Sequence, residues 1–225
     1  MWYDIEKTTE SQRSARTDMV KFIIIRHGLT DFNKIHKYQG QFDSSLEPLG
    51  VEQAELTAKH VAENYHVDAI YASDLSRTVN TAKPFARLLG LPVSTTPAFR
   101  EIDVGEWAQQ FIADVKKTDP EGVRIYNEDP GVFRFPGGEN FAEVYERTAK
   151  KIEEIAEKHD GETVLIISHG GVIRTLIARW LGYPIRELRR VKPMGNTAIT
   201  IAEYENGKAK LLLIGDNSHL PEDMR

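Results

Sequence analysis

The sequence contains no cysteine among its 225 residues. This absence excludes disulfide bonds, thiolate nucleophiles and cysteine-based metal sites. The chain also lacks any apolar run near the roughly 20 residues that a membrane-spanning helix needs. Its N-terminus is polar and has no signal-peptide core. We therefore expect a cytoplasmic protein that has no membrane partner.

A strong charge of one sign is missing as well. The formal net charge is −5, from 29 Lys and Arg against 34 Asp and Glu, which gives no electrostatic indication of nucleic-acid binding. Hydrophobic residues make up 40% of the chain and charged residues 28%, as is usual for a globular protein. The length suits one sizeable α/β domain with a full core.

Two short apolar runs in this sequence end in the same way. Residues 20–25 lead into Arg26-His27-Gly28, and residues 163–167 lead into Ser168-His169-Gly170-Gly171. Runs this short and this rich in β-branched residues predict buried strands of a parallel sheet. Two histidines are then delivered to the carboxyl edge of the sheet, where open α/β sheets bind ligands. Histidine suits nucleophilic or acid–base chemistry near neutral pH.

The remaining patterns predict an α/β fold. We expect a three-layer sandwich, with a mostly parallel central sheet flanked by helices and a short cap segment of about residues 108–135. The expected helices cover residues 48–64, 75–89 (capped by Ser73-Asp74), 108–117, 141–159 and 171–181, and the further strands cover residues 69–72 and 93–95. A hairpin of residues 197–204 and 208–214 turns at Asn206-Gly207.

The domain boundaries follow from the same patterns. We expect a single domain over residues 19–225, because no repeat, linker or low-complexity tract divides this part of the chain. Residues 1–18 are charged and aperiodic. They are expected to be an extension, either disordered or left over from cloning, or to reflect a misassigned start with Met19 as the true beginning.

Several charged residues lie where predicted elements begin, and together they suit phosphoryl transfer. Arg26 and Arg77 can clamp a phosphoryl group with forked donors. A neutral His27 can attack its phosphorus, and Glu101, kept protonated in a sheltered site, can protonate the leaving oxygen. The helix start at Gly170 offers backbone donors to an anion. This set needs no metal and no cofactor, since the arginines and His169 neutralise the developing charge.

At this point the sequence resembles the histidine phosphatase superfamily, which includes phosphoglycerate mutases and many small-molecule phosphatases. The resemblance spans almost all of residues 19–220. The matching blocks are Arg26-His27-Gly28-x-Thr30 with Asn33, Ser73-Asp74-Leu75-x-Arg77-x-x-x-Thr81-Ala82, Arg100-Glu101 with Gly105 and Trp107, Pro136-Gly137-Gly138-Glu139, and Ser168-His169-Gly170-Gly171; Gly195-Asn196-Thr197 is a minor echo.

The resemblance implies a role for each matching residue. His27 would be the phosphorylated nucleophile and Glu101 the proton donor. Phosphate would be bound by Arg26, Arg77 and His169, with Asn33 and Gly170 as further contacts. The implied partner is a small phosphorylated metabolite, bound by a monomer or a homodimer. Leu29 and Ala108-Gln109 depart from the family pattern near the substrate opening, which leaves the substrate open.

Three functions remain open from the sequence. The leading hypothesis is a metal-independent phosphomonoesterase that works through a phosphohistidine. The second is a 2,3-bisphosphoglycerate-dependent phosphoglycerate mutase, although residues 108–135 are shorter and less basic than the corresponding mutase segment. The third is a non-catalytic regulatory or dimerisation module of the same fold, which the intact set of charged residues disfavours.

Some residues also have a simpler structural interpretation. Asp103 and Glu106 are alternatives to Glu101, and Asn33 suits a turn. Asn140 is expected to cap the long helix, Arg174 to be a structural partner and His219 to pack near the C-terminus. The other histidines, His36, His60, His66 and His159, show no metal-ligand spacing.

Overall fold

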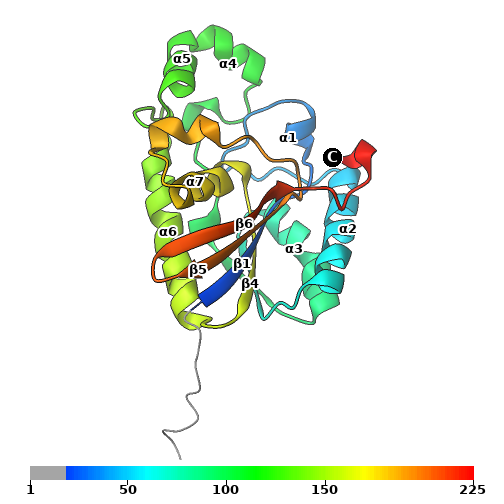
Figure 1. Cartoon of the computed structure of the whole chain (residues 1–225). Helices are drawn as coiled ribbons and strands as arrows, with labels where there is room; N and C mark the ends of the chain where they lie inside the picture. The colour runs from blue at the N-terminus through cyan, green and yellow to red at the C-terminus, as the bar shows by residue number, and fades with distance from the viewer. Residues whose placement is uncertain (1–18) are drawn as a thin grey trace, which may run out of the picture.

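A six-stranded sheet forms the centre of the structure, a computed structural model that describes residues 19–225 (Figure 1). The strand order is β3-β2-β4-β1-β5-β6. Neighbours among β3, β2, β4 and β1 pair in parallel, whereas β5 is antiparallel to β1 and to β6. The strands are β1 (Met19–Arg26), β2 (Ala69–Ser73), β3 (Val93–Thr96), β4 (Thr163–Ser168), β5 (Ile199–Glu205) and β6 (Lys208–Asp216). The predicted mostly parallel sheet is confirmed, and the extension expected at residues 1–18 lies outside the described residues.

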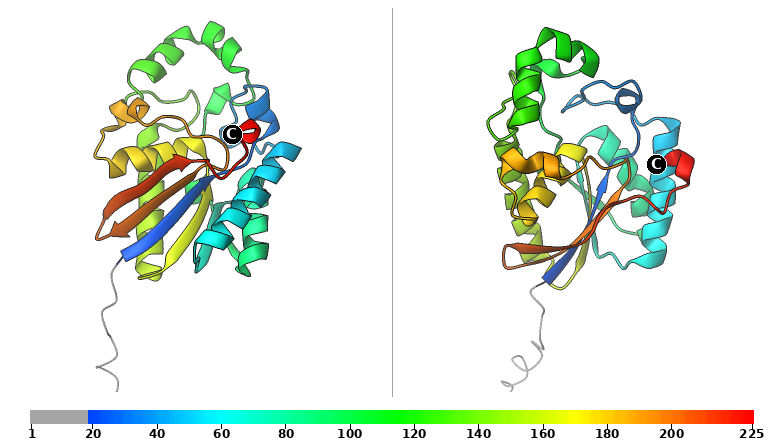
Figure 2. Two further views of the ribbon diagram at one scale, coloured as in Figure 1. Left: turned by 45° about the vertical axis from the view of Figure 1, so that its right-hand side comes forward. Right: turned by 45° about the horizontal axis from the view of Figure 1, so that its top comes forward.

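Helices cover both faces of the sheet, which confirms the predicted three layers. On one face lie α2 (Pro48–Asn64) and α3 (Ser76–Leu89), and on the other lie α6 (Phe141–Lys158) and α7 (Gly170–Trp180), as Figures 1 and 2 show. The predicted cap by Asn140 is confirmed, since its side chain accepts a hydrogen bond from the Glu143 amide at the start of α6. No helix within residues 19–225 is long and apolar enough to cross a membrane.

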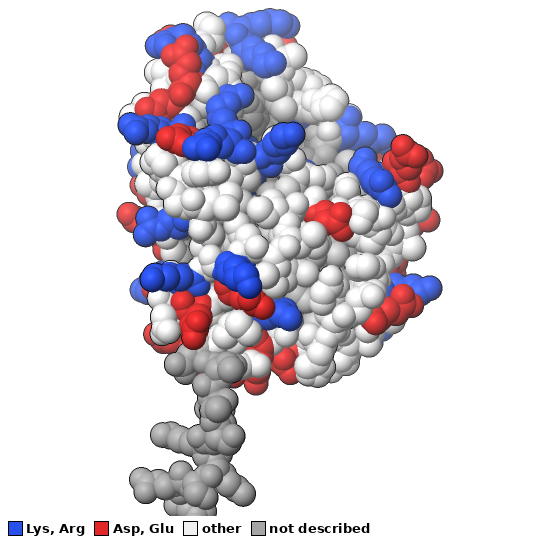
Figure 3. Space-filling model, viewed as in Figure 1, with Lys and Arg blue, Asp and Glu red and all other residues white. Residues whose placement is uncertain are grey.

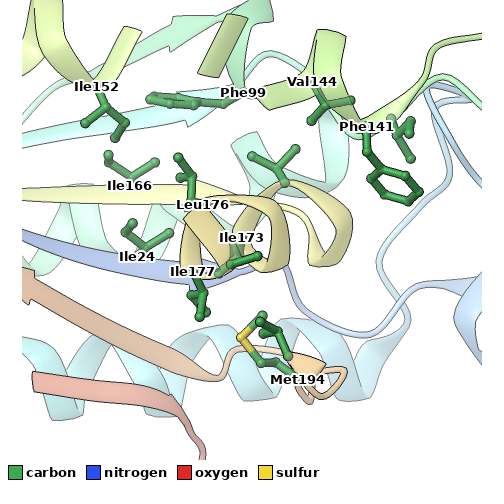
Figure 4. Packing of buried hydrophobic residues seen from close by; sticks show 14 of the residues in the cluster. Ile24, Phe99, Phe141, Val144, Ile152, Ile166, Ile173, Leu176, Ile177 and Met194 are labelled. Atoms are coloured by element: carbon green, nitrogen blue, oxygen red, sulfur yellow. The ribbon is translucent and has the colours of Figure 1, made fainter. Parts of the chain in front are cut away.

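Side chains of the central strands alternate between the two helical layers. Ile23 and Ile25 of β1 pack with α2 and α3, while Phe22 and Ile24 pack with α6 and α7. Figure 4 shows Ile24 near Ile173 and Ile177 of α7. A strand buried on both faces needs apolar residues at every position, so the sequence shows continuous apolar runs rather than alternating ones.

The chain leaves the two central strands toward opposite faces. After β1 it runs into α2 on one face, and after β4 it runs into α7 on the other. Such a divergence opens a crevice at the carboxyl edge of an α/β sheet. The parallel register pairs Arg26 with Ser168. His27 and His169 therefore leave the sheet at the same level, as the sequence predicted.

Two short helices arch over this edge of the sheet, α4 (Ile112–Thr118) and α5 (Pro120–Glu128) (Figure 2). They fall within the predicted cap segment, where short helices were expected and residues 108–117 were one candidate. The second begins because the Asp119 side chain accepts a hydrogen bond from the Gly122 amide and Pro120 occupies the first turn. The same Asp119 side chain accepts a 3.1 Å hydrogen bond from Nε1 of buried Trp107 and so ties the arch to the body.

The predicted capping of α3 by Ser73-Asp74 is wrong. The helix begins at Ser76, and its N-cap residue Leu75 makes no side-chain capping bond. Asp74 instead accepts hydrogen bonds of 2.7 and 2.6 Å from Arg100, so a distant ion pair replaces the local cap.

The predicted bounds 48–64 of α2 are confirmed, and the other element boundaries differ from the predictions by at most four residues. The first hairpin arm begins at Ile199 rather than at residue 197, because Thr197 has a φ of 52°, which a strand cannot accommodate. The polar loop after β1 contains one helical turn, α1 (Asp31–Lys34). The 3₁₀ helices within residues 19–225 are η1 (Pro97–Phe99), η2 (Gly105–Trp107), η3 (Ile185–Arg190) and η4 (Glu222–Met224).

Candidate active site

A tight backbone crossing fixes the loop that carries His27. A Cβ atom on Gly28 would lie only 2.3 Å from the carbonyl oxygen of Gly50, so this contact with α2 requires glycine. The Gly28 amide donates a 3.0 Å hydrogen bond to Oγ1 of Thr81 on α3. Asn196 donates a 2.9 Å hydrogen bond from Nδ2 to the His27 carbonyl oxygen. The main chain of His27 is thereby held from three sides.

The ring of His27 has a defined tautomer. Its Nδ1 lies 2.8 Å from the carbonyl oxygen of Gly28. A carbonyl oxygen can only accept, so Nδ1 carries the proton and Nε2 has a free lone pair. Burial lowers the pKa of His27 well below 6.5, and the positive charges of Arg77 and Arg26 lower it further. His27 is thus neutral at pH 7 with Nε2 unprotonated.

His169 has the opposite tautomer. It is fully buried, and its ring centroid lies 5.2 Å from that of His27. Arg77 donates a 3.2 Å hydrogen bond from Nε to Nδ1 of His169, so the proton of the neutral ring is on Nε2. Burial, followed by the charge of Arg77, lowers the pKa of His169 well below 6.5. Its Nε2 has no hydrogen-bond partner within residues 19–225, a feature expected where a ligand oxygen binds.

Two arginines lie beside these rings, and no carboxylate in the described part of the chain is hydrogen-bonded to either. Arg77 is fully buried and donates to the carbonyl oxygens of Phe42 (2.8 Å) and Gly40 (2.7 Å). Burial lowers the pKa of Arg77 to about 10, so it remains charged at pH 7. Arg26 donates a 2.6 Å hydrogen bond to the Met194 carbonyl oxygen, and its buried Nε has no partner in the described part of the chain.

The Glu101 carboxylate lies against the start of α7. Oε2 accepts a 3.1 Å hydrogen bond from the Gly171 amide, and Oε1 accepts a 2.9 Å bond from the Ile102 amide. A Cβ atom on Gly171 would lie 2.4 Å from Oε1, so the carboxylate can approach only a glycine here. One backbone donor of this helix end is therefore taken by Glu101, while Gly170 lines the cavity described below.

An ion pair that sequence reasoning missed anchors the Glu101 main chain. Arg147 donates a 3.2 Å hydrogen bond to the Glu101 carbonyl oxygen and pairs with Glu139 at 3.0 Å. Gln41 donates to the same carbonyl at 3.2 Å. Glu139 lies in one of the glycine-rich blocks quoted from the sequence. Arg147 lies on an amphipathic helix, and no sequence motif marked it as part of the site.

A cavity of about 360 Å³ opens between the carboxyl edge of the sheet and the α4–α5 arch. It is lined by six of the seven predicted site residues: Arg26, His27, Asn33, Arg77, Glu101 and Gly170. The seventh, His169, is not among the lining residues and is in ring contact with His27. Figure 3 shows basic residues gathered beside a hollow below the arch. Of the three candidate acids, Glu101 lines the cavity and Asp103 and Glu106 do not.

Asn33 has a structural role as well. It occupies the third position of α1, and its side chain and that of Thr30 form a reciprocal capping box. Oδ1 of Asn33 also accepts a 3.3 Å hydrogen bond from Asn196. Asn196 thus links Asn33 to the main chain of His27, a connection for which the sequence gave only the minor echo at residues 195–197.

The outer part of the cavity combines aromatic walls with two further cations. Lys37 lies over the Phe111 ring, 4.6 Å from its centroid, and lines the cavity. Arg174 lines it from α7 and donates to the carbonyl oxygens of Val191 (3.0 Å) and Leu188 (3.3 Å). The predicted structural role of Arg174 is therefore confirmed, but its place on the cavity wall was missed. The other outer lining residues are Tyr38, Ile102, Val104, Ile112, Tyr126, Phe135, Phe141, Pro193 and Met194.

The remaining histidines lie elsewhere. His219 packs against α2, where its Nε2 is 2.9 Å from Oγ1 of Thr57 and its ring stacks on His60, as the packing interpretation predicted. His159 contacts the Tyr71 hydroxyl at 2.9 Å, and His66 pairs with Asp68 at 2.8 Å. Within residues 19–225, no three His, Asp or Glu side chains are grouped so that they could hold a metal ion.

Comparisons with known proteins agree with this arrangement. The family model described as histidine phosphatase superfamily (branch 1) matches residues 22–217. Phosphoserine phosphatase 1 of Hydrogenobacter thermophilus is 32% identical over 206 residues, covering 91% of this chain and 96% of that protein. Phosphoglycerate mutase-like protein 4 of Arabidopsis thaliana is 31% identical over 212 residues, covering 93% and 90%.

Comparison with a solved structure supports the same family. Mycobacterial glucosyl-3-phosphoglycerate phosphatase superimposes with a TM-score of 0.82 at 26% identity, covering 88% of this chain and all (100%) of that one. The shared fold confirms the predicted architecture. The chain belongs to the histidine phosphatase superfamily (branch 1) and is a phosphatase of that family.

Proposed function

We propose that this chain is a metal-independent phosphomonoesterase that hydrolyses a small phosphorylated metabolite through a phosphohistidine on His27. The state of the His27 ring carries the proposal. The hydrogen bond from Nδ1 to the Gly28 carbonyl oxygen, at 2.8 Å, leaves Nε2 as an unprotonated nucleophile at the cavity wall. Since the ring is held neutral by burial and by two arginines, no proton must be removed before attack.

The groups around Nε2 suit a phosphoryl group. Arg26 and Arg77 supply two positive charges, and both retain donors that no atom of residues 19–225 uses. The Nε2–H of His169 supplies a further donor. Gly170 begins an 11-residue helix whose dipole favours an anion at this end. These groups would hold the phosphoryl oxygens while His27 approaches the phosphorus.

The proposed reaction has two steps. In the first, Nε2 of His27 attacks phosphorus, the ester P–O bond breaks, and the Glu101 carboxyl group gives its proton to the leaving oxygen. In the second, Glu101 takes a proton from water as that water attacks the phosphohistidine, and inorganic phosphate leaves. Glu101 ends each cycle protonated. Arg26, Arg77 and His169 stabilise the negative charge on the phosphoryl oxygens in both steps.

The size of the cavity and the named relatives support a small substrate. About 360 Å³ lies at the low end of small-molecule pockets. The relatives include a phosphoserine phosphatase and a glucosyl-3-phosphoglycerate phosphatase. Mutase activity is the second candidate, because a phosphoglycerate mutase-like protein is among the relatives. The two functions differ in the fate of the phosphoryl group, which passes to water or back to a second substrate molecule.

A panel of small phosphomonoesters incubated with the full chain tests the proposal. We expect inorganic phosphate to be released at an undiminished rate in excess EDTA. Loss of activity in EDTA would overturn the metal-independent mechanism. With 3-phosphoglycerate, we expect phosphate release to exceed isomerisation, with or without 2,3-bisphosphoglycerate. Isomerisation that dominates and depends on the bisphosphate would establish the mutase instead.

A further inference from the structure

The cavity contains more positive charge than a phosphate group needs. Among the described residues, four cationic side chains line it, and Glu101 is the single carboxylate that does so. The cations are Arg26, Lys37, Arg77 and Arg174. A phosphomonoester carries at most two negative charges. Even with Glu101 ionised, one positive charge remains without a counter-ion when such a substrate is bound.

Arg174 and Lys37 are the two lining cations that the proposed phosphoryl site does not use, and Arg174 is the one on the same helix as Gly170. It lies four residues after Gly170 on α7, so both residues are on the same face of the helix. Four residues of helix, a rise of about 6 Å, separate the two positions along the axis. The Arg174 side chain therefore lines the cavity next to the phosphoryl site rather than within it.

The guanidinium of Arg174 is held rigidly by neutral groups. Nε and Nη2 donate to the carbonyl oxygens of Val191 and Leu188 at 3.0 and 3.3 Å. Neither acceptor is charged, and no carboxylate within residues 19–225 forms an ion pair with Arg174. Burial lowers its pKa, while Tyr126 and the charge of Glu101 act in the opposite direction.

Three arginines outside the cavity, in contrast, form ion pairs with carboxylates. Arg100 pairs with Asp74 at 2.6 Å, Arg147 with Glu139 at 3.0 Å, and Arg87 with Glu55 at 2.6 Å. The fold thus supplies a carboxylate to Arg100 and Arg147, which are half-buried outside the cavity, whereas the exposed Arg179, Arg189 and Arg225 have no ion-pair partner among the described residues. Leaving a partly buried arginine without one is costly, unless a ligand provides the negative charge.

We infer that the substrate carries a carboxylate beside its phosphate, and that Arg174 binds this carboxylate. The inference rests on the proposed phosphatase function and adds a substrate class to it, the short phosphorylated carboxylic acids. The apolar walls formed by Phe135, Phe141 and Met194 suit the carbon chain between the two anionic groups. Lys37, at the outer wall, adds to the positive field that attracts a doubly anionic substrate.

The structural alternative is that Arg174 only braces η3 through its two backbone hydrogen bonds. A bracing role would affect every substrate alike. A binding role would affect the discrimination between a substrate with a carboxylate and one without it. The ratio of kcat/KM values for a matched pair of substrates therefore separates the two roles.

The test compares 3-phosphoglycerate with glycerol 3-phosphate, which has a hydroxymethyl group in place of the carboxylate. For the wild-type chain we expect kcat/KM to be about 10- to 100-fold higher for 3-phosphoglycerate, the gain from one charge-assisted contact. Arg174→Gln should bring this ratio close to one, mainly through KM for 3-phosphoglycerate. The matched control is Arg179→Gln, because Arg179 lies on the same helix but packs on Tyr145 outside the cavity. It should leave the ratio unchanged.

The outcomes separate this inference from the proposed function. A wild-type ratio near one, or an Arg174→Gln variant that keeps the wild-type ratio, would overturn the inference while leaving the phosphatase intact. Absence of phosphate release from both substrates and from p-nitrophenyl phosphate would overturn the proposed function itself. If Arg174→Gln loses its cooperative thermal transition, the wild-type ratio decides alone: about tenfold or more supports the inference, and a ratio near one rejects it.

Discussion

Two pairs of histidine rings lie at nearly the same spacing but in very different surroundings. The centroids of His27 and His169 are 5.2 Å apart at the carboxyl ends of β1 and β4. Those of His60 and His219 are 5.0 Å apart on the flank of α2. In the first pair Arg77 donates to His169 and adds its charge to that of Arg26 beside His27. In the second, the hydroxyl of Thr57 contacts His219.

The difference shows that neighbours decide what a histidine pair can do. In the first pair a carbonyl oxygen and a guanidinium fix opposite tautomers, so one ring presents a lone pair and the other a proton. The ring with the lone pair also lines the cavity. The second pair fastens the C-terminal segment to α2, together with the hydrogen bond from Gln53 to the Met224 carbonyl oxygen. We therefore expect the first pair to control activity and the second to control stability.

Removing one ring from each pair should give the largest contrast. His27→Ala removes the proposed nucleophile, and we expect kcat to fall by at least about 10⁴-fold. His219→Ala removes a half-buried ring outside the cavity, and phosphate release should stay within about twofold of wild type. Steady-state phosphate release from one substrate measures both. An active His27→Ala variant would contradict the assignment of the two pairs.

The proton donor beside the first pair can be tested through the leaving group. Glu101→Gln should lower kcat/KM for an alkyl phosphate by about 10²- to 10⁴-fold, because the alkoxide then leaves without a proton. The loss should be under about tenfold for p-nitrophenyl phosphate, whose phenolate is stable without one. Asp103→Asn is the matched control, since Asp103 accepts from the Gly105 amide at 2.9 Å and does not line the cavity. Equal losses on both substrates would argue against proton donation by Glu101.

The smallest effect concerns pH. The pKa of His27 lies well below 6.5, so its ring is still neutral at pH 6.5. In the pH profile of kcat/KM, the fall in activity on the acid side should therefore lie below pH 6.5. Burial lowers the pKa of His219 to about 4. The unfolded chain then binds more protons between pH 6.5 and 4, and stability must fall as the pH falls through this window.

The contribution of His219 can be isolated by difference. His219→Ala should remove about 1 kcal/mol of the pH dependence of the unfolding free energy, a value reduced for solvent screening at this partly exposed site. Urea unfolding of both chains at pH 7 and pH 4.5 measures it. An unchanged pH dependence in the variant would show that His219 is not buried in its neutral form. His27 and His169 contribute equally to both chains and cancel.

Sequence patterns predicted the parts of this molecule that depend on local signals. Apolar runs located β1 and β4, and the glycines after each histidine marked the turns that the close packing at Gly28 and Gly171 requires. The order of the blocks also indicated which charged residues meet. Six of the seven predicted site residues line one cavity, and the seventh, His169, contacts the ring of His27.

What the sequence could not predict depends on contacts between distant segments. Asp74 looked like a helix cap, but an arginine 26 positions later along the chain takes it as an ion-pair partner. Arg147 reaches the Glu101 carbonyl from a different layer of the fold. The sequence around Arg174 does not distinguish a structural arginine from one that contacts a ligand. A binding role is indicated only when the charged residues that line the cavity are considered together.

The most direct test of the account is to trap the phosphoryl group on the enzyme. Wild-type protein is mixed with phosphorus-32-labelled substrate and quenched in alkali, where phosphohistidine survives, and its peptides are then mapped. We predict label on the peptide that contains His27, bonded to Nε2, and no label on His27→Ala. Label on another residue, or phosphate release by His27→Ala at the wild-type rate, would contradict the account.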